Sequence, residues 1–211
     1  GRPSWRLDLP IQRAYGTSMG TASCIERLRD YVAIPSVNPM GRSDIPETIA
    51  GEARYAEEVR QNLRRLGLDA ELLGDPSRPS VLAEARTEAA IDTVLFASHL
   101  DTVPVDGMEI DPFDPVLQDG RVYGRGACDT KGGMAALLAA LERVLERGTL
   151  RRNVIVVGEA DEELGGTGAR DVLAHLESRQ VRPDWALATE PTDLRQVTHH
   201  KGIALARLVA H

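Results

Sequence analysis

The stretch TVLFASHLD, residues 93–101, begins with an apolar run and ends in polar groups. A continuous apolar run of this length is typical of a strand that is buried on both faces of a sheet. The stretch NVIVVGEAD, residues 153–161, has the same pattern, and the shorter run WALA at residues 185–188 predicts a third buried strand. Long segments separate these runs, which favours parallel pairing because parallel neighbours need crossover connections.

Helical patterns lie before and between these strands. A capping box formed by Ser23 and Glu26 predicts a helix that Pro35 stops, and a second helix is expected to begin near Pro46 and end at Gly67. Strands that alternate with helices predict an α/β fold, with a mostly parallel twisted sheet flanked by helices. The other expected elements are helices over 131–147 and 167–176, strands over 70–73 and 80–85, a hairpin over 116–123 and a further strand over 198–209.

The composition is that of an ordinary globular chain. Of its 211 residues 42% are hydrophobic, and 25 basic against 32 acidic residues leave a net charge of −7. This balance argues against a nucleic-acid or membrane-surface partner, and no apolar run approaches the ~18 residues of a membrane span. Two cysteines make no disulfide scaffold, and the first residues lack the apolar core of a signal peptide. We therefore expect a cytoplasmic protein.

Acidic residues and one histidine follow the three predicted buried strands. In open α/β sheets, ligands bind beyond the carboxyl ends of the strands. Carboxylates and an imidazole gathered at that edge suit a divalent ion such as zinc or manganese. The candidates are His99 and Asp101 after the first strand, Asp161, Glu162 and Glu163 after the second, Glu190 after the third, and Asp129 in the loop before the 131–147 helix.

His99 and Asp101 are two residues apart, and this spacing allows them to act together at a metal site. Residues two apart on a strand share a face, so the carboxylate can hydrogen-bond the far ring nitrogen of a histidine that binds a metal. Taken singly, each residue favours a simpler interpretation: His99 is a satisfied histidine without a ligand, and Asp101 is an ordinary turn residue at a strand end. The pair therefore indicates a metal site only together with the other candidates.

The remaining acids are also open to two interpretations. Asp129 lies in the glycine-rich segment YGRGACDTKGG, which matches neither a dinucleotide-binding fingerprint nor a Walker loop, and it is equally an N-cap for the helix that follows. Glu162 and Glu163 are either part of a solvated loop, or a pair in which one carboxylate holds a metal while its neighbour acts as general base.

Four segments, in order, resemble the zinc-dependent M20 metallopeptidases, a family that includes acetylornithine deacetylase, succinyl-diaminopimelate desuccinylase, aminoacylase and glutamate carboxypeptidase. They are SHLDTVPV (98–105), DPFDPVLQDGRVYGRGACDTKGG (111–133), DEELGG (161–166) and TEPT (189–192). IPSVNP at 34–39 is similar to the N-terminal turn of that family. The resemblance implies the N-terminal portion of a zinc-peptidase-like catalytic domain over residues 21–197. Residues 1–20 would be a disordered or extraneous tail, and residues 198–211 a strand that leads toward a lid domain.

The resemblance also implies the metal ligands and the cofactors. Two divalent ions are expected, zinc first, with cobalt or manganese as alternatives. His99 and Glu190 would bind one ion, Asp129 would bridge both, and Glu163 would bind the second. The Asp129–Thr130 peptide bond is expected to be cis.

The implied activity is hydrolysis of the amide bond in N-acyl amino acids or small peptides, by water that the two ions activate. Glu162 would be the general base, and Asp101 would orient His99. The partners would be that small-molecule substrate and, for the full-length protein, a second copy in a homo-oligomer.

The chain departs from the family pattern at its end. Family members carry a further histidine ligand after an inserted lid or dimerisation domain, and neither is recognisable before His211. His199, His200 and His211 are not evident substitutes. The resemblance thus covers an incomplete catalytic domain without a lid. The alternative interpretation is a truncated, non-catalytic protein of the same fold that binds a metal or a partner chain.

Overall fold

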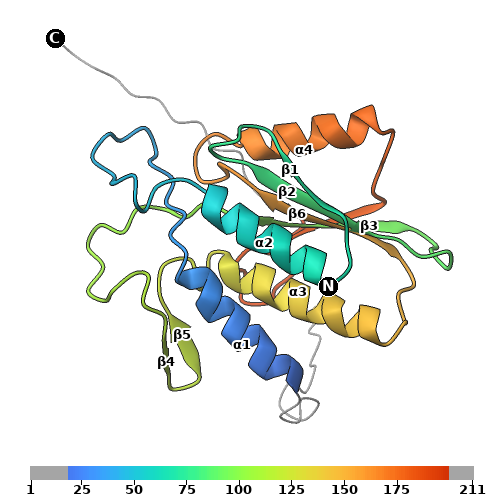
Figure 1. Cartoon of the computed structure of the whole chain (residues 1–211), viewed down its shortest axis with the longest axis horizontal. Coiled ribbons are helices and arrows are strands. Elements are labelled where there is room, and N and C mark those ends of the chain that lie inside the picture. The colour runs from blue at the N-terminus through green and yellow to red at the C-terminus, as the bar shows by residue number, and fades with distance from the viewer. Residues whose placement is uncertain (1–18, 200–211) are drawn as a thin grey trace, which may run out of the picture.

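The computed structural model describes residues 19–199, with side chains from residue 24 onward. Within this range five strands form one sheet in the order β1-β2-β6-β3-β7 (Figure 1). β3 pairs in parallel with β6 and β7, whereas β2 runs antiparallel to β1 and β6, so four of the five strands point in one direction. The predicted α/β fold is confirmed. The strands are β1 (Ala70–Leu73), β2 (Ser80–Ala85), β3 (Thr93–His99), β6 (Asn153–Glu159) and β7 (Trp185–Ala188).

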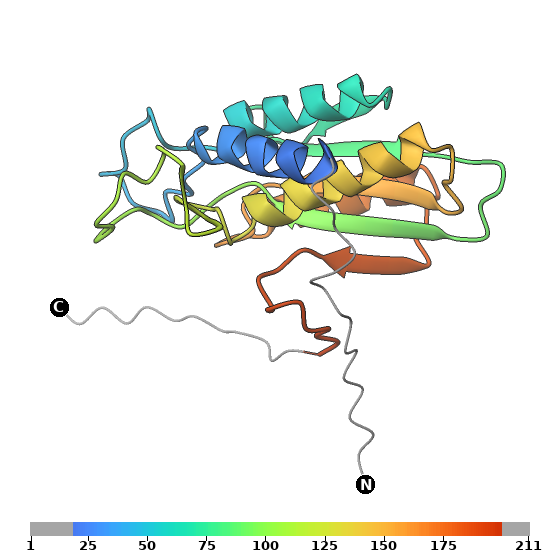
Figure 2. The same ribbon diagram turned by 90° about the horizontal axis from the view of Figure 1, so that it is seen from below.

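Helices cover both faces of the sheet (Figures 1 and 2). On one face α2 (Ala53–Arg65) packs against β1 and β2, α3 (Lys131–Glu146) packs against β3, and α1 (Met19–Val32) packs against α3. On the other face α4 (Thr167–Ser178) packs against β1, β2 and β6. Where α4 covers it the sheet is therefore the middle of three layers, which explains the buried β6, whereas residues 93–97 of β3 are only partly buried, so the prediction that this strand is buried on both faces holds only at its end.

The central strand β6 supplies side chains to two separate cores. Val154 and Val156 join the core that contains residues of α1, α2 and α3, while Ile155 and Val157 join the core beneath α4. Successive side chains of a strand point to opposite faces, so a strand between two helical layers must be apolar throughout. β6 is buried from Val154 to Gly158, and the predicted buried strand over this stretch is confirmed.

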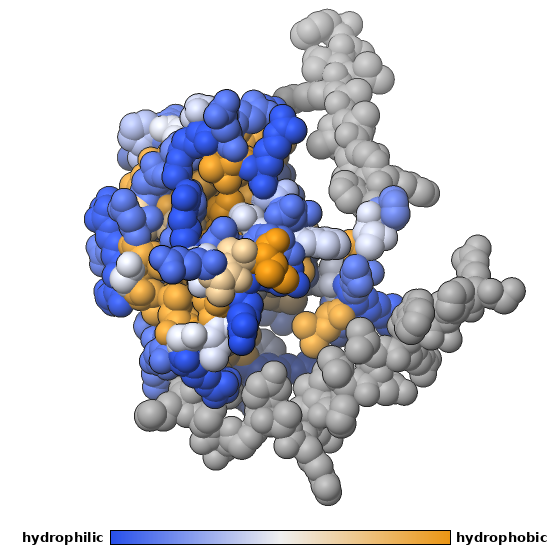
Figure 3. Space-filling model, turned by 90° about the vertical axis from the view of Figure 1, so that its right-hand side faces the viewer, coloured by the Kyte–Doolittle hydropathy of each residue, from blue (hydrophilic) through white to orange (hydrophobic). Residues whose placement is uncertain are grey.

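The strand expected over residues 185–188 forms, but the prediction that it is buried is wrong. All four residues of β7 are exposed, with Trp185 at 63% and Leu187 at 51%. Within the described residues β7 is an edge strand that pairs only with β3. Figure 3 shows apolar patches between hydrophilic side chains on the face that it views. An apolar sequence indicates a strand, whereas its burial depends on neighbours that the run itself does not specify.

Two helices begin elsewhere than expected. α1 begins at Met19, so Ser23 lies within the helix and not at the N-cap position expected for it. The second helix begins at Ala53 and not near Pro46, because residues 49–51 form backbone hydrogen bonds with Val37 instead. Val37 accepts a hydrogen bond from the Gly51 amide and donates one to the Ile49 carbonyl, which takes that backbone out of any helix.

The predicted hairpin is confirmed as β4 (Val116–Gln118) and β5 (Arg121–Tyr123). Asp119 and Gly120, between the strands, both have positive φ, at 50° and 72°. Two positive φ angles match the type I′ turn that a two-residue Asp-Gly hairpin favours. Of the strand expected over 198–209, Thr198 and His199 are not in a strand, and the rest lies outside the described residues. Among residues 19–199 the helices are too short or too polar to cross a membrane.

Candidate metal centre

The carboxyl ends of β3, β6 and β7 lie at one edge of the sheet. His99, the last residue of β3, is in register with Glu159, the last residue of β6. β7 runs parallel to β3, and the Thr189 amide that follows it donates a hydrogen bond of 2.9 Å to the Ala97 carbonyl. This pairing brings Glu190 toward His99, as expected for polar residues that follow parallel strands.

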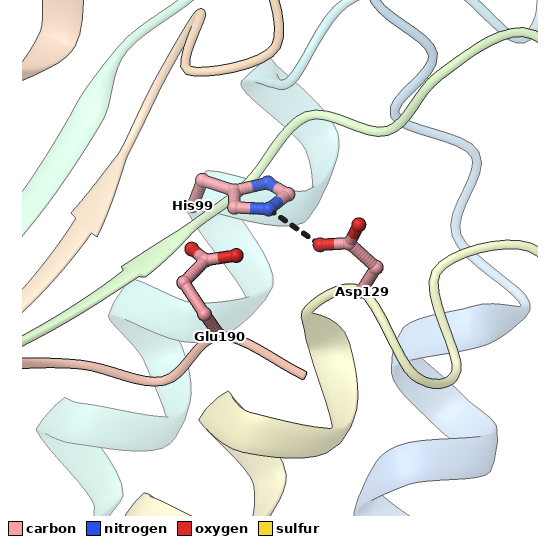
Figure 4. A group of neighbouring side chains, drawn as sticks. All are labelled: His99, Asp129 and Glu190. Carbon is pink, nitrogen blue, oxygen red and sulfur yellow. Dashed lines mark hydrogen bonds and ion pairs between the residues drawn. The ribbon is translucent and has the colours of Figure 1, made fainter. Parts of the chain in front are cut away.

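Three of the predicted ligands converge at this edge. One ligand atom from each of His99, Asp129 and Glu190 lies within 4.8 Å of the other two, and Figure 4 shows both carboxylates beside the imidazole ring. The Nε2 atom of His99 is 2.8 Å from Oδ1 of Asp129. The His99 side chain is 1% exposed, whereas that of Asp129 is 50% exposed. The cluster thus combines a buried imidazole with carboxylates that solvent and solutes can reach.

The other ring nitrogen of His99 is held by Asp101, but by its backbone. Nδ1 is 2.9 Å from the Asp101 carbonyl oxygen and 3.6 Å from the carboxylate Oδ1. The expected hydrogen bond to the carboxylate is therefore replaced by one to the main chain. When Nδ1–H donates to this carbonyl, Nε2 carries the lone pair that a metal needs. Burial lowers the pKa of His99, but the Asp101 charge and the Asp129 hydrogen bond outweigh it and raise the pKa above its usual value.

The Asp101 carboxylate holds the acidic loop in place. Asp101 is fully buried, and its Oδ1 and Oδ2 accept hydrogen bonds of 3.0 and 3.1 Å from the backbone amides of Glu162 and Glu163. Asn38 donates a third bond, of 2.8 Å, to Oδ2. Hydrogen bonds to an ionised acceptor are stronger than neutral ones. Asp101 therefore links the end of β3 to the start of the acidic loop after β6.

Glu162 and Glu163 occupy different environments. The Glu162 side chain is exposed and Glu163 is half-buried. Burial raises the pKa of Glu163, nearby His99 lowers it, and the charge of Asp129 raises it further. Glu163 is not part of the His99–Asp129–Glu190 group among the described residues, so the structure brings together three of the four predicted ligands.

The glycine-rich segment lets the start of α3 approach its neighbours. A Cβ added to Gly133 would lie 2.6 Å from Cβ and 2.8 Å from the backbone oxygen of Thr189, which precedes Glu190. The Asp129–Thr130 peptide bond is cis, as the resemblance implied. The Thr130 hydroxyl donates a hydrogen bond of 3.2 Å to the His99 carbonyl. These contacts fix Asp129 and Glu190 relative to the end of β3.

Two polar residues at this edge, Asn38 and Glu159, were not among the predicted site residues. Asn38 is 1% exposed and lies in the IPSVNP segment, which resembled a family turn but suggested no role. Burial and the charge of Glu162 raise the pKa of Glu159, a half-buried strand residue whose only sequence signal was its place two residues before Asp161. Of the histidines at the chain end, His199 is exposed beside Thr198, and the other two lie outside the described residues.

The donor set fits a divalent metal ion. An imidazole nitrogen with its tautomer set by a backbone carbonyl, and two carboxylates, converge from separate segments of the chain. Such mixed nitrogen and oxygen donors suit zinc and its neighbours in the first transition row. Sheet and cluster together define an α/β domain with a candidate metal site.

Comparison with known proteins places the chain within this class. The model of peptidase family M20/M25/M40 matches residues 95–203, about half of the chain. The chain therefore belongs to this family. It is 36% identical over 173 residues to succinyl-diaminopimelate desuccinylase of Gluconacetobacter diazotrophicus, which is 78% of this chain and 42% of that protein. It is 37% identical over 142 residues to acetylornithine deacetylase of Klebsiella pneumoniae, which is 66% of this chain and 36% of that protein.

A solved structure has the same arrangement. An M20 family metallo-carboxypeptidase from Sulfolobus solfataricus superposes with a TM-score of 0.62 at 29% identity, over 79% of this chain and 37% of that chain. The chain spans less than half the length of each of these three relatives.

Proposed function

We propose that this chain carries the metal-binding part of a hydrolase that cleaves the amide bond of N-acyl amino acids or small peptides. The observation that supports this most is the convergence of His99, Asp129 and Glu190 beside the acidic loop that Asp101 holds. The relatives support the reaction class, since two are named as a desuccinylase and a deacetylase and one as a metallo-carboxypeptidase.

The proposal assigns a metal-binding role to four residues. His99, Asp129 and Glu190 would hold one divalent ion, and Asp129 with Glu163 would hold the second, with zinc as the first candidate. Bound there, the ions would polarise the scissile carbonyl and lower the pKa of water. Nδ1 of His99 stays bonded to the Asp101 carbonyl and so keeps Nε2 directed at the ligand position.

Glu162 is the proposed general base. Its backbone amide is bonded to the buried Asp101 carboxylate, while its own carboxylate is exposed and free to meet solvent and substrate. A carboxylate in this place takes a proton from the attacking water and returns it to the leaving amine, a transfer that contributes typically 10²–10⁴-fold to rate.

The test compares Glu162→Gln with Glu88→Gln in the complete gene product. Glu88 is an exposed acid in the loop before β3, at the opposite end of that strand from His99. Zinc stoichiometry is measured by titration, and turnover is measured on N-acetyl and N-succinyl amino acids. We expect Glu162→Gln to keep zinc binding and lose at least about 100-fold in kcat, and Glu88→Gln to behave as wild type.

Two outcomes would contradict the proposal in different ways. Normal turnover in Glu162→Gln would remove Glu162 from the role of base while leaving the metal site in place. One zinc or none per chain, with no turnover of any substrate by the wild-type protein, would favour a non-catalytic metal-binding protein of the same fold.

A further inference from the structure

We propose that Asn38 is a positioning residue that locks the ends of β3 and β6 together and so holds Glu162 at the angle that hydrolysis requires. The inference rests on the proposed function, because it concerns the placement of the proposed base. It assigns a role to the IPSVNP segment, which lies more than 60 positions from Asp101 and more than 120 from Asp161 in the sequence.

The side chain of Asn38 bridges two carboxylates from different strand ends. Its Nδ2 donates a hydrogen bond of 2.8 Å to Oδ2 of Asp101 and another of 3.1 Å to Oδ1 of Asp161. Its Oδ1 accepts a hydrogen bond of 2.9 Å from the Met40 amide, which fixes the amide plane. Both hydrogens of the amide are therefore committed to carboxylates that follow β3 and β6.

The backbone of Asn38 is held as firmly as its side chain. The backbone N–H of Asn38 donates a hydrogen bond of 2.8 Å to the Thr102 carbonyl, and the backbone N–H of Thr102 donates one of 3.0 Å to the Ser36 carbonyl. Val37 forms parallel bridges with both Thr102 and Ala50. Residues 36–38 therefore run beside the segment that continues β3. These backbone hydrogen bonds fix the position from which the Asn38 side chain reaches the two carboxylates.

Asp161 is the point at which the chain turns from β6 into the acidic loop. Its φ is 60°, in the left-handed region that residues other than glycine rarely adopt. Its carboxylate accepts a hydrogen bond of 2.9 Å from Thr167 and lies 3.1 Å from Arg78. Asn38 adds the contact that ties this turn to Asp101, which lies just beyond the end of the neighbouring strand β3.

The electrostatics explain why an amide suits this position. Asp101 is fully buried and Asp161 is 5% exposed, so their charges would repel each other in a region from which water is largely excluded. An asparagine donates to both carboxylates without adding charge. An aspartate there would have the same shape but would place a third carboxylate between them.

The Asn38 bridge also affects where Glu162 and Glu163 lie in the acidic loop after β6. Asp101 Oδ2 accepts from Asn38 and from the Glu163 amide, while Oδ1 accepts from the Glu162 amide. A shift of Asp101 would therefore move Glu162 relative to His99. Misplacement of a reacting group by about 1 Å can cost on the order of 10²-fold in rate.

The experiment compares Asn38→Asp and Asn38→Ala with the control Asn62→Asp in the complete gene product. Asn62 is also buried, at 9% exposed, and its Nδ2 donates to the backbone and side chain of Glu58 within α2. Thermal midpoint, zinc affinity, the visible absorption bands of the cobalt-loaded protein, and kcat and KM are measured below the lowest midpoint.

We expect both aspartate variants to lower the thermal midpoint. Of these two aspartate variants, Asn38→Asp but not Asn62→Asp should also lower kcat, by on the order of 10²-fold, with a small change in KM and shifted cobalt bands. Asn38→Ala, which removes the two donors without adding charge, should lower kcat in the same direction and by less. If Asn38→Asp does not fold, Asn38→Ala alone decides the question.

Wild-type kcat and cobalt bands in a folded Asn38 variant would overturn the inference while leaving the proposed function intact. Equal losses of kcat in Asn38→Asp and Asn62→Asp would also overturn it, because both would then reflect general destabilisation. Absence of turnover and of zinc binding in the wild-type protein would instead refute the proposed function.

Discussion

Replacing Lys131 by methionine should make the chain progressively less stable, relative to wild type, as the pH rises from 7.5 to 9.5. Lys131 is 1% exposed at the start of α3. Its Nζ donates to the backbone oxygens of Tyr31 and Ile34, at 3.0 and 2.6 Å, and lies 4.7 Å from the centre of the Tyr55 ring. The carbonyls and the ring favour a charged amine, whereas burial disfavours it.

Burial wins this competition. It lowers the pKa of Lys131 to about 7 from an ordinary 10.5, with a smaller contribution from the charge of Arg54. Between these two values the unfolded chain binds a proton that the folded chain does not, so folding becomes more favourable as the pH rises. The stability that the neutral amine contributes is fully present above pH 10.5 and is lost as the pH falls through 7.

The size of the effect follows from the two pKa values. Linkage limits the slope to about 1.4 kcal/mol per pH unit for one group. Between pH 7.5 and 9.5 the wild-type chain should therefore gain about 2.5 kcal/mol that the Lys131→Met chain does not. The difference between the two proteins isolates this residue, because other titrating groups cancel.

Urea unfolding of both metal-free proteins at four pH values measures this difference. A difference in unfolding free energy that stays constant between pH 7.5 and 9.5 would refute the reasoning. It would show that the two carbonyls and the Tyr55 ring keep the ammonium charged in spite of its burial.

Two further substitutions test how the fold positions the site. Gly133→Ala should destabilise the chain by about 1–3 kcal/mol, the usual cost of overpacking, and should weaken zinc binding because the added methyl displaces Thr189 and the Glu190 that follows; unchanged zinc affinity in a titration would contradict this. Arg78→Leu removes a guanidinium that bonds the fully buried Glu52 at 2.7 and 2.9 Å. Because the Arg78 side chain is 30% exposed, the loss should fall near the lower end of the about 3–5 kcal/mol typical of broken buried pairs. If the unfolding free energy measured in urea falls by less than about 1 kcal/mol, the Glu52 carboxylate does not need the Arg78 guanidinium, because solvent reaches and hydrates it.

The sequence by itself determined the layers of the fold and the edge at which the site lies. Apolar runs such as residues 153–157 specify a strand between two helical layers, because side-chain alternation exposes both of its faces to packing. Polar residues that follow such runs must gather at one edge when the strands are parallel. His99 and Glu190 follow such runs, whereas Asp129 lies in the loop before α3, and the resemblance to the M20 family implied that these three share one ion; they are neighbours in the structure.

The tertiary structure alone decided which atoms meet. The Asp101 backbone rather than its carboxylate holds Nδ1 of His99, Asn38 bridges Asp101 and Asp161, and β7 is exposed. The Asn38 contacts and the exposure of β7 depend on segments that are distant in the sequence. His99 and Asp101 are only two residues apart, but less than an ångström separates the 2.9 Å contact of Nδ1 with the Asp101 carbonyl from its 3.6 Å distance to the Asp101 carboxylate. Local periodicity specifies which face a side chain occupies. Only the packing of one element against another sets the partner and the distance that it finds there.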